Sequence, residues 1–204
     1  MTHIVAISQR VDVIAGRDEH RDALDQRWNE LLARCGLLVL QIPNNVEMAT
    51  GLIERFQPCG VILTGGNDLS SYGGESPERD ATEEMLIDWA VVSRRPLLAV
   101  CRGLQMLMHH QGVTLAPVTD HAGIRHQVVT DKGARDVNSY HNWGLHEVPD
   151  DFYASARAPD GSIEEVRHET LPIHGMMWHP ERESPFLERD ISMIRQFFEG
   201  EQNT

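Results

Sequence analysis

The feature that most constrains this chain is a short apolar run that ends at a cysteine and continues directly as a helical pattern. Pro96 precedes the run Leu97-Leu98-Ala99-Val100, and a short apolar run bounded by a breaker is typical of a fully buried strand. Cys101 closes the run, and Gly103 follows it. The next apolar residues recur at helical spacing as far as Gly112: Leu104, Leu107 and Met108. A strand that turns sharply into a helix through a nucleophile predicts a nucleophile elbow.

An elbow of this kind would make Cys101 reactive. The turn exposes the nucleophile and leaves the next backbone N–H, that of Arg102, free to stabilise an oxyanion. The N-terminus of the following helix also lowers the pKa of a thiol, and the thiolate is the reactive form. The alternative is an ordinary buried cysteine at the end of a strand. This stretch alone leaves both interpretations open.

Strands and helices alternate through the first half of the sequence. The apolar runs that predict buried strands cover residues 3–7, 37–42 and 61–63. Helical spacing predicts helices over residues 24–35, 46–56 and 81–93, the second with Asn45 as its N-cap. This alternation predicts an α/β fold with a mostly parallel sheet, and ligands of such sheets bind outside the carboxyl ends of the strands. We therefore expect three loops to converge there: an irregular charged segment over 8–19, then 64–72 and 101–103.

The pattern changes after Gly112. Short runs separated by polar turns predict antiparallel strands over 127–129, 135–138, 144–148, 153–158 and 163–166. A buried strand over 173–178 and a closing helix over 184–198 complete the expected elements. With 204 residues and no linker composition, the chain is expected to form one domain over residues 1–204.

Charge and cysteine usage exclude several functional classes. The formal net charge of −13 argues against non-specific nucleic-acid binding, which depends on basic patches. No apolar stretch approaches the ~20 residues of a membrane span, so no membrane partner is expected. Three scattered cysteines form no disulfide framework, which fits a cytoplasmic protein. The sequence leaves open whether the chain forms a homodimer.

The 11 histidines do not form a recognisable metal motif. There is no H-E-x-x-H and no Cys/His cluster with zinc spacing, and the adjacent pair His109-His110 does not share a helix face. Neither a metal nor a cofactor is predicted.

Two further loops offer the partners that a nucleophilic cysteine needs. Gly65-Gly66 follows the predicted strand 61–63, and paired glycines let a backbone approach a ligand closely. His179 ends the last predicted strand and Glu181 lies two residues on, close enough to orient the imidazole. Cys101, His179 and Glu181 therefore have the chemistry of a triad. The alternatives are a plain tight turn or a phosphate loop at the glycines, a turn histidine, and a solvated glutamate.

Three separated motifs together resemble the class I glutamine amidotransferase-like superfamily, in its γ-glutamyl hydrolase branch. They are Ala99-Val100-Cys101-Arg102-Gly103-Leu104-Gln105, Leu63-Thr64-Gly65-Gly66-Asn67-Asp68-Leu69 and Met177-Trp178-His179-Pro180-Glu181. The resemblance implies a flavodoxin-like three-layer α/β sandwich with Cys101 as nucleophile, His179 as base and Glu181 as its partner. It departs from the family's pattern at Ala99, where glycine is common, and in the segment after Gly112.

The same resemblance implies the remaining site residues. The backbone N–H groups of Gly66 and Arg102 would form the oxyanion hole. The residues implied in binding the glutamyl group are Gly65, Gln105, Asn138, Ser139, Tyr140 and His141. The alternative for the segment 138–139 is an ordinary turn, and for Gln105 a helix-surface residue satisfied by water.

The front of the chain bears on the leaving group. Arg10 and Arg21 lie on, or just after, the loop that follows the first strand, and arginine suits bidentate binding of phosphate or carboxylate. The run from Arg21 to Trp28, with Pro43-Asn44-Asn45, resembles a small subgroup of these hydrolases. That subgroup removes glutamate from a γ-glutamyl-CDP-amidate in phosphoramidate modification of bacterial surface polysaccharide. The alternative is a solvated helix face with i,i+4 charge pairs.

The sequence thus predicts a cysteine-dependent hydrolase of a γ-glutamyl amide bond in a small molecule. One alternative is a glutaminase subunit that passes ammonia to a partner synthetase, and hydrolysis of another γ-glutamyl amine is a second. A catalytically silent binding module on the same fold is a third, against which the intact triad argues.

Overall fold

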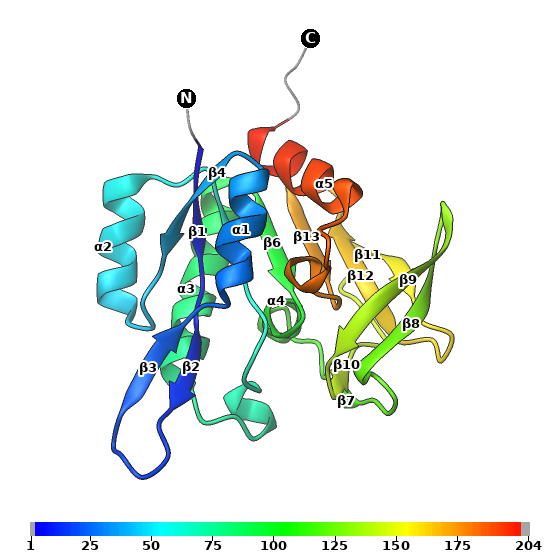
Figure 1. Cartoon of the computed structure of the whole chain (residues 1–204), viewed down its shortest axis with the longest axis horizontal. Helices are drawn as coiled ribbons and strands as arrows, with labels where there is room; N and C mark the ends of the chain where they lie inside the picture. Colours follow the sequence, from blue (N-terminus) through cyan, green and yellow to red (C-terminus); the bar gives the residue numbers. More distant parts are fainter. Residues whose placement is uncertain (1–2, 201–204) are drawn as a thin grey trace.

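The computed structural model describes residues 3–200 and is built around a nine-stranded mixed sheet (Figure 1). Its strand order is β4-β1-β5-β6-β13-β12-β11-β8-β9. The first five strands run parallel: β4 (Leu37–Gln41), β1 (His3–Ile7), β5 (Gly60–Leu63), β6 (Leu97–Val100) and β13 (Ile173–Met176). The remaining four pair antiparallel: β12 (Ile163–His168), β11 (Phe152–Arg157), β8 (Ala122–Thr130) and β9 (Gly133–Tyr140). The predicted parallel core and its antiparallel extension are both present.

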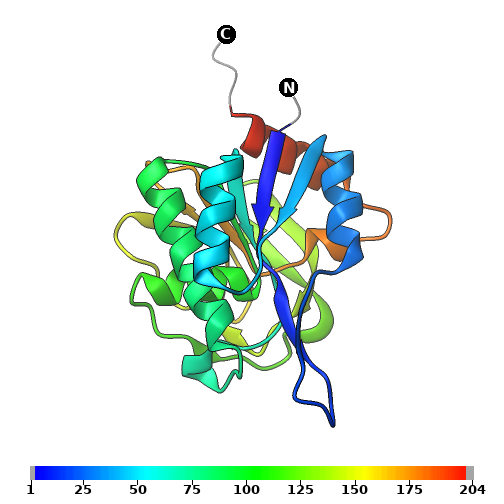
Figure 2. The ribbon, with the colours of Figure 1, turned by 90° about the vertical axis from the view of Figure 1, so that its left-hand side faces the viewer.

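Helices cover both faces of the parallel core and complete a three-layer sandwich (Figures 1 and 2). On one face lie α2 (Val46–Phe56), α3 (Pro77–Ser93) and α4 (Arg102–His110), and on the other α1 (Gln26–Arg34) and α5 (Glu188–Glu199). Alternate strand residues pack on opposite faces, as the two-residue period of a strand requires. In β6, Leu97 and Ala99 pack with α4, whereas Leu98 and Val100 pack with α1 and α5.

Local sequence signals set the helix ends. Asn45 caps α2 as predicted, because its side-chain oxygen accepts the N–H of Met48. The prediction that the third helix begins at residue 81 was wrong, since α3 begins at Pro77. A proline in the first turn of a helix loses no hydrogen bond, so the charged residues between Pro77 and Ala81 belong to the helix.

The charged segment after β1 is not irregular as expected. Residues Arg10–Val13 (β2) and His20–Ala23 (β3) form an antiparallel hairpin that turns near Gly16. Val11 is buried, and the side chain of Asn67 bonds both its N–H and its carbonyl group. The long-range pairing with Asn67 stabilises strands whose charged composition favours a loop. The hairpin projects beyond the carboxyl ends of the parallel strands (Figure 1).

Smaller differences occur in the second half. The predicted strand over 144–148 is reduced to β10 (Trp143–Gly144), which pairs with β7 (Ala116–Pro117), and to one bridge between Leu145 and Ile163. The closing helix α5 begins at Glu188 rather than residue 184. Two 3-10 turns, η1 (Ser70–Tyr72) and η2 (Pro180–Arg182), follow β5 and β13.

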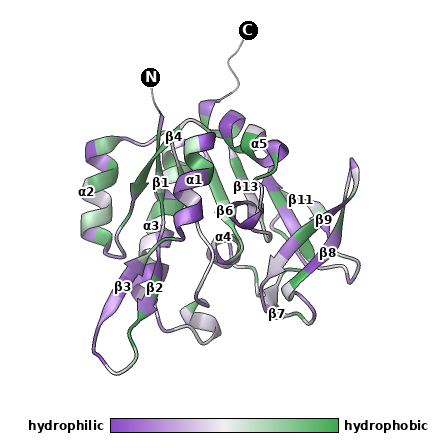
Figure 3. Ribbon diagram, viewed as in Figure 1, coloured by the Kyte–Doolittle hydropathy of each residue, from purple (hydrophilic) through white to green (hydrophobic). Residues whose placement is uncertain are grey.

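Hydropathy follows this architecture. The central strands are apolar, whereas the β2–β3 hairpin is mainly hydrophilic (Figure 3). Within residues 3–200, no helix combines the length and the apolar character needed to cross a membrane.

Candidate active site

Cys101 stands at a strained turn between β6 and α4. Its backbone has φ 53° and ψ −110°, a region that residues with a Cβ atom rarely occupy. Close packing of the following helix requires Gly103, because a Cβ there would lie 2.4 Å from the carbonyl oxygen of Leu63. The predicted nucleophile elbow is therefore present, and it places Cys101, a residue that is 5% exposed, at the carboxyl end of β6.

His179 and Glu181 form a buried pair beyond the end of β13. Nδ1 of His179 lies 2.7 Å from Oε1 of Glu181, and both side chains are only 2% exposed. Because a carboxylate only accepts hydrogen bonds, Nδ1 is the donor. Nε2 of His179 is buried and has no hydrogen-bond partner in residues 3–200, so this nitrogen is available to exchange a proton with the thiol.

The electrostatics favour a thiolate–imidazolium pair. Burial alone would raise the pKa of Cys101, but the charge and the hydrogen bond of His179, together with the backbone N–H of Arg102, hold the pKa below the ordinary thiol value. Burial would likewise lower the pKa of His179, whereas the Glu181 carboxylate and the Cys101 thiolate raise it. Both shifts therefore favour the thiolate, which is the reactive form of cysteine.

The loop after β5 packs directly on the imidazole. A Cβ at Gly65 would lie 2.5 Å from Cε1 of His179, so only glycine fits at this approach. Gly66 has φ 87°, a conformation that glycine adopts without a Cβ penalty. Its N–H has no acceptor in residues 3–200. The carbonyl of Gly65 accepts from Arg79, and in a trans peptide the N–H of the next residue points the opposite way. The N–H of Gly66 thus points away from Arg79.

A buried ion network holds this loop and was not anticipated from the sequence. The fully buried Arg79 donates to the carbonyl groups of Thr64, Gly65 and Gly66. It also pairs with Glu83, whose Oε1 lies 3.0 Å from Nε of Arg79. Further partners surround the same two side chains: the Arg102 guanidinium, which bonds Glu83 and Asp80, and the Ser8 hydroxyl, which donates to Glu83.

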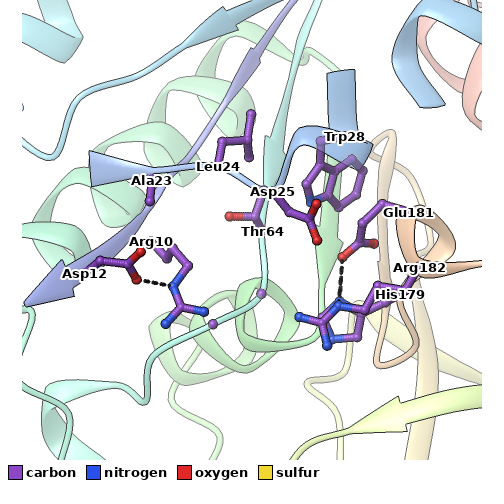
Figure 4. Close-up of a pocket in the computed structure, with 12 residues that line it drawn as sticks. Arg10, Asp12, Ala23, Leu24, Asp25, Trp28, Thr64, His179, Glu181 and Arg182 are labelled. Atoms are coloured by element: carbon purple, nitrogen blue, oxygen red, sulfur yellow. Dashed lines mark hydrogen bonds and ion pairs between the residues drawn. The ribbon is translucent and has the colours of Figure 1, made fainter. Parts of the chain in front are cut away.

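Two hollows meet at this loop. The first extends toward the hairpin and contains both polar and apolar groups (Figure 4). Its lining residues include Arg10, Asp12, Trp28, Thr64, Gly65, Gly66, His179, Glu181 and Arg182. The second shares Gly66 with the first. Its lining residues are Gly66, Asn67, Asp68, Cys101, Arg102, Gln105, Tyr140, His141 and Asn142. Gly66 lines both, so the two hollows can accept two parts of one ligand.

Several of the predicted binding residues lie in these hollows. Gln105, Tyr140 and His141 line the second one with Cys101, while Gly65 and Arg10 line the first. The Tyr140 ring also packs edge-on against His179, with ring centroids 5.5 Å apart. The structure thus brings one group of predicted residues together around Cys101 and the other around His179.

Asn138 and Ser139 lie behind the site rather than on its surface. The side chain of Asn138 accepts the N–H of His179 at 2.8 Å and donates to its carbonyl group at 2.9 Å. Ser139 is fully buried and its hydroxyl donates to the carbonyl group of His121. Their observed contacts therefore position the backbone around the site.

Arg21 does not contact the candidate triad, whereas Arg27 does. The guanidinium of Arg21 pairs with Glu19 at 2.6 Å on the hairpin, outside the residues that line either hollow. Arg27, at the start of α1, donates to the backbone carbonyl groups of Glu181 and Glu183. Its contact with Glu181 fixes the acid of the candidate triad. No local sequence pattern indicates this link across 154 residues.

Comparison with known proteins identifies relatives over almost the whole chain. The family model described as peptidase C26 matches residues 3–181. The γ-glutamyl-CDP-amidate hydrolase of Campylobacter jejuni subsp. jejuni serotype O:2 is 36% identical over 197 residues, which cover 95% of this chain and 96% of that protein. The γ-glutamyl-γ-aminobutyrate hydrolase of Escherichia coli O157:H7 is 30% identical, over 87% of this chain and 84% of that protein.

Solved structures give the same result for the fold. A glutamine amidotransferase from Thermotoga maritima superposes with a TM-score of 0.69 at 16% identity, covering 100% of this chain and 87% of that one. The matched family model and the relatives together show that the chain belongs to the peptidase C26 family of class I glutamine amidotransferase-like proteins.

Proposed function

We propose that this chain hydrolyses a γ-glutamyl amide bond, with Cys101 as nucleophile, His179 as acid and base, and Glu181 as the group that orients the imidazole. The observation that carries the proposal is the buried thiol of Cys101, which stands at a strained turn and interacts with the imidazole of His179, itself fixed 2.7 Å from the buried carboxylate of Glu181. The family relationship supports γ-glutamyl chemistry, because relatives matched over most of the chain are named as γ-glutamyl hydrolases.

In the first half of the reaction, the Cys101 thiolate attacks the γ-carbonyl carbon of the substrate. The tetrahedral intermediate collapses as the C–N bond breaks and the imidazolium of His179 gives its Nε2 proton to the leaving nitrogen. A γ-glutamyl thioester remains on Cys101. The amine or amidate leaves with the proton.

In the second half, the neutral His179 accepts a proton from water. The resulting hydroxide attacks the thioester carbon, the C–S bond breaks, and glutamate leaves. Cys101 returns as thiolate beside protonated His179, which restores the starting pair. Glu181 keeps the hydrogen bond to Nδ1 throughout and stabilises the charged ring.

The backbone N–H groups of Gly66 and Arg102 are proposed as the oxyanion hole. The N–H of Gly66 points away from Arg79, and the N–H of Arg102 lies close enough to lower the pKa of Cys101. Preorganised donors of this kind stabilise the charge that develops on the carbonyl oxygen.

For the leaving group, we propose a cytidine diphosphate amidate, whose release from the glutamyl group would serve phosphoramidate modification of surface polysaccharide. The supporting observations are the 36% identity to a γ-glutamyl-CDP-amidate hydrolase and the two arginines, Arg10 and Arg182, in the first hollow. The hollow with Gln105, Tyr140 and His141 would then take the glutamyl group. Guanidinium groups suit phosphate oxygens because their planar N–H pairs match them in geometry.

The test is glutamate release by the purified chain from γ-glutamyl-CDP-amidate, γ-glutamyl-γ-aminobutyrate and glutamine, with Cys101→Ala as the matched variant. Cysteine-dependent turnover of the CDP-amidate, faster than that of the other two substrates, is expected. Preferred turnover of γ-glutamyl-γ-aminobutyrate would support the proposed hydrolytic reaction but contradict the proposed leaving group. Activity on glutamine alone would favour the glutaminase-subunit alternative, and turnover that persists in Cys101→Ala would contradict the proposal.

A further inference from the structure

A second cluster of chemically active side chains lies beside the candidate site, on the antiparallel half of the sheet. His121 precedes β8, His141 follows β9, and Glu164 lies on β12. The side chains of these three residues are 5%, 1% and 0% exposed. One ligand atom from each lies within 4.8 Å of the other two. His126, on β8, approaches the second oxygen of Glu164.

Hydrogen bonds outside the cluster fix the two histidine tautomers. Nε2 of His121 lies 3.0 Å from a carboxylate oxygen of Asp160, and Nδ1 of His141 lies 3.0 Å from the carbonyl oxygen of Trp143. Both partners are acceptors at neutral pH, so these ring nitrogens carry the protons. In the neutral rings, the lone pairs on Nδ1 of His121 and Nε2 of His141 therefore point into the cluster.

Both lone pairs meet the same carboxylate oxygen. Oε1 of Glu164 lies 3.3 Å from Nδ1 of His121 and 3.4 Å from Nε2 of His141. None of these atoms, nor the second oxygen of Glu164, has a hydrogen-bond partner in residues 3–200. Three lone pairs facing one another in a buried space repel, unless two extra protons or a cation lies between them.

Other histidine–carboxylate pairs in this protein help to decide between extra protons and a cation. His174 and His179 bond their carboxylate partners at 2.6 Å and 2.7 Å, the distances of charge-assisted hydrogen bonds. By contrast, the ring nitrogens of His121, His141 and His126 lie 3.3–3.5 Å from the carboxylate oxygens of Glu164. Zinc bound tetrahedrally at about 2.0–2.1 Å separates its ligand atoms by about 3.3–3.4 Å. The spacing therefore fits ligands around a shared cation better than direct hydrogen bonds.

We propose that His121, His141 and Glu164 bind a divalent transition-metal ion, with Zn²⁺ as the preferred ion. Two imidazoles and one carboxylate suit Zn²⁺, whereas Mg²⁺ and Ca²⁺ favour sets made of oxygen ligands. Asp160 and the Trp143 carbonyl group orient the imidazoles, and His126 faces the remaining oxygen of Glu164.

The site joins the β8–β9 hairpin to the centre of the sheet. Two of its ligands flank the open end of the hairpin, opposite the turn, and the third comes from β12; His141 also lines the hollow that contains Cys101. The ion would thus fix the wall of that hollow while the thiol carries the chemistry. The spacings of 20 and 23 residues between successive ligands form no known motif, so this set of ligands cannot be recognised from the sequence.

The test uses the full chain without an affinity tag, in a Cys101→Ala background so that the thiol cannot bind the added metal. After chelator treatment, Zn²⁺ is titrated in competition with a chromogenic chelator. We expect one tight site per chain and no competition from Mg²⁺. Co²⁺ should produce visible absorption bands of a nitrogen–oxygen site without a thiolate charge-transfer band. The proposal would be overturned if the chain failed to compete with the chromogenic chelator for Zn²⁺, or if the Co²⁺ spectrum showed a thiolate charge-transfer band.

Variants locate the ion. Glu164→Gln should weaken Zn²⁺ binding by at least about 100-fold, and Asp160→Asn, which alters an orienting group, by about 10- to 100-fold. Asp150→Asn, an exposed change on the same half of the protein, should bind as the parent does. Circular dichroism checks that each variant folds. If Glu164→Gln does not fold, Asp160→Asn and the Co²⁺ spectrum decide. Unchanged affinity in Asp160→Asn together with a Co²⁺ spectrum lacking imidazole ligands would reject the site.

Discussion

The backbone of Gly65 touches the imidazole of His179, and a methyl group at this glycine would lie 2.5 Å from Cε1 of the ring. We predict that Gly65→Ala displaces His179 and lowers kcat/KM by about 100-fold, because misplacement of a reacting group by about 1 Å has an effect of this size. The measurement is glutamate release, with the thermal unfolding midpoint as a check on folding.

The matched control is Gly51→Ala on α2, where a Cβ meets nothing within 4 Å. This variant should keep full activity and gain about 0.5–1 kcal/mol of stability, since alanine favours a helix over glycine. Full activity in Gly65→Ala would show that the ring does not need its present position.

Thiol alkylation should report the electrostatics of Cys101. Because its pKa lies below the ordinary thiol value, we expect the alkylation rate to remain high at neutral pH and to fall only as the pH drops through that lowered pKa. His179→Gln removes the charge that lowers the pKa of Cys101 but leaves the thiol buried. The pKa of Cys101 should therefore rise, and its alkylation rate at neutral pH should fall about tenfold for each unit of that rise.

Cys35 provides the internal control for this experiment. Burial raises its pKa to about 11, so Cys35→Ser should leave the alkylation rate at neutral pH unchanged. A Cys101 rate that rises only near the ordinary thiol pKa would contradict the thiolate–imidazolium pair.

Arg79 should affect both stability and catalysis. Arg79→Met leaves Glu83 buried beside fewer positive charges, which should cost about 3–5 kcal/mol in the free energy of unfolding by urea. Arg79→Lys keeps a charge but lacks the planar fork that bonds three successive carbonyl groups. We expect its kcat to fall by about 100-fold as the Gly66 donor loses its position. The exposed Arg55→Lys on α2 should change neither quantity, and equal kcat in both lysine variants would exclude a role in positioning.

Arg10 and Arg21 should differ in their effect on substrate choice. Arg10 lines the first hollow and packs on Gly66, whereas Arg21 pairs with Glu19 on the exposed hairpin. Arg10→Met should raise KM for γ-glutamyl-CDP-amidate by about 10- to 100-fold more than for γ-glutamyl-γ-aminobutyrate, since a hydrogen bond to a charged group is worth about 1.5–3 kcal/mol. Arg21→Met serves as the matched control. Equal losses on both substrates would show that Arg10 does not contact a phosphate.

Local patterns in the sequence predicted most of the parallel core. The continuous apolar runs of β1 and β6, the Asn45 cap and the elbow at Cys101 each depend on neighbouring residues, so they can be recognised without tertiary information. In the β2–β3 hairpin, apolar residues alternate with polar ones at Val11 and Val13, as in a strand. The residue that bonds this strand, Asn67, lies 56 positions further along the sequence. Charged composition therefore concealed a strand that a distant amide stabilises.

The support of the candidate site could not be inferred in the same way. In the sequence, Arg79 is one of several charged residues just before the helix predicted over 81–93. Only the fold shows that it is fully buried behind Gly65 and Gly66. Asn138 was assigned to substrate by resemblance, while its observed bonds hold the backbone of His179. The residue types at these positions indicate polar contacts, but they do not show whether the partner is a substrate or the protein's own backbone.

The two bonds between Asn67 and Val11 connect the hairpin to the loop that carries Gly66. A change that remodels the hairpin for another leaving group would therefore be transmitted to the N–H of Gly66, the proposed oxyanion donor. Grafting a hairpin from a relative should preserve turnover only where the graft keeps a backbone partner for Asn67. In directed evolution of this enzyme, new specificity and catalytic rate would then have to be selected together.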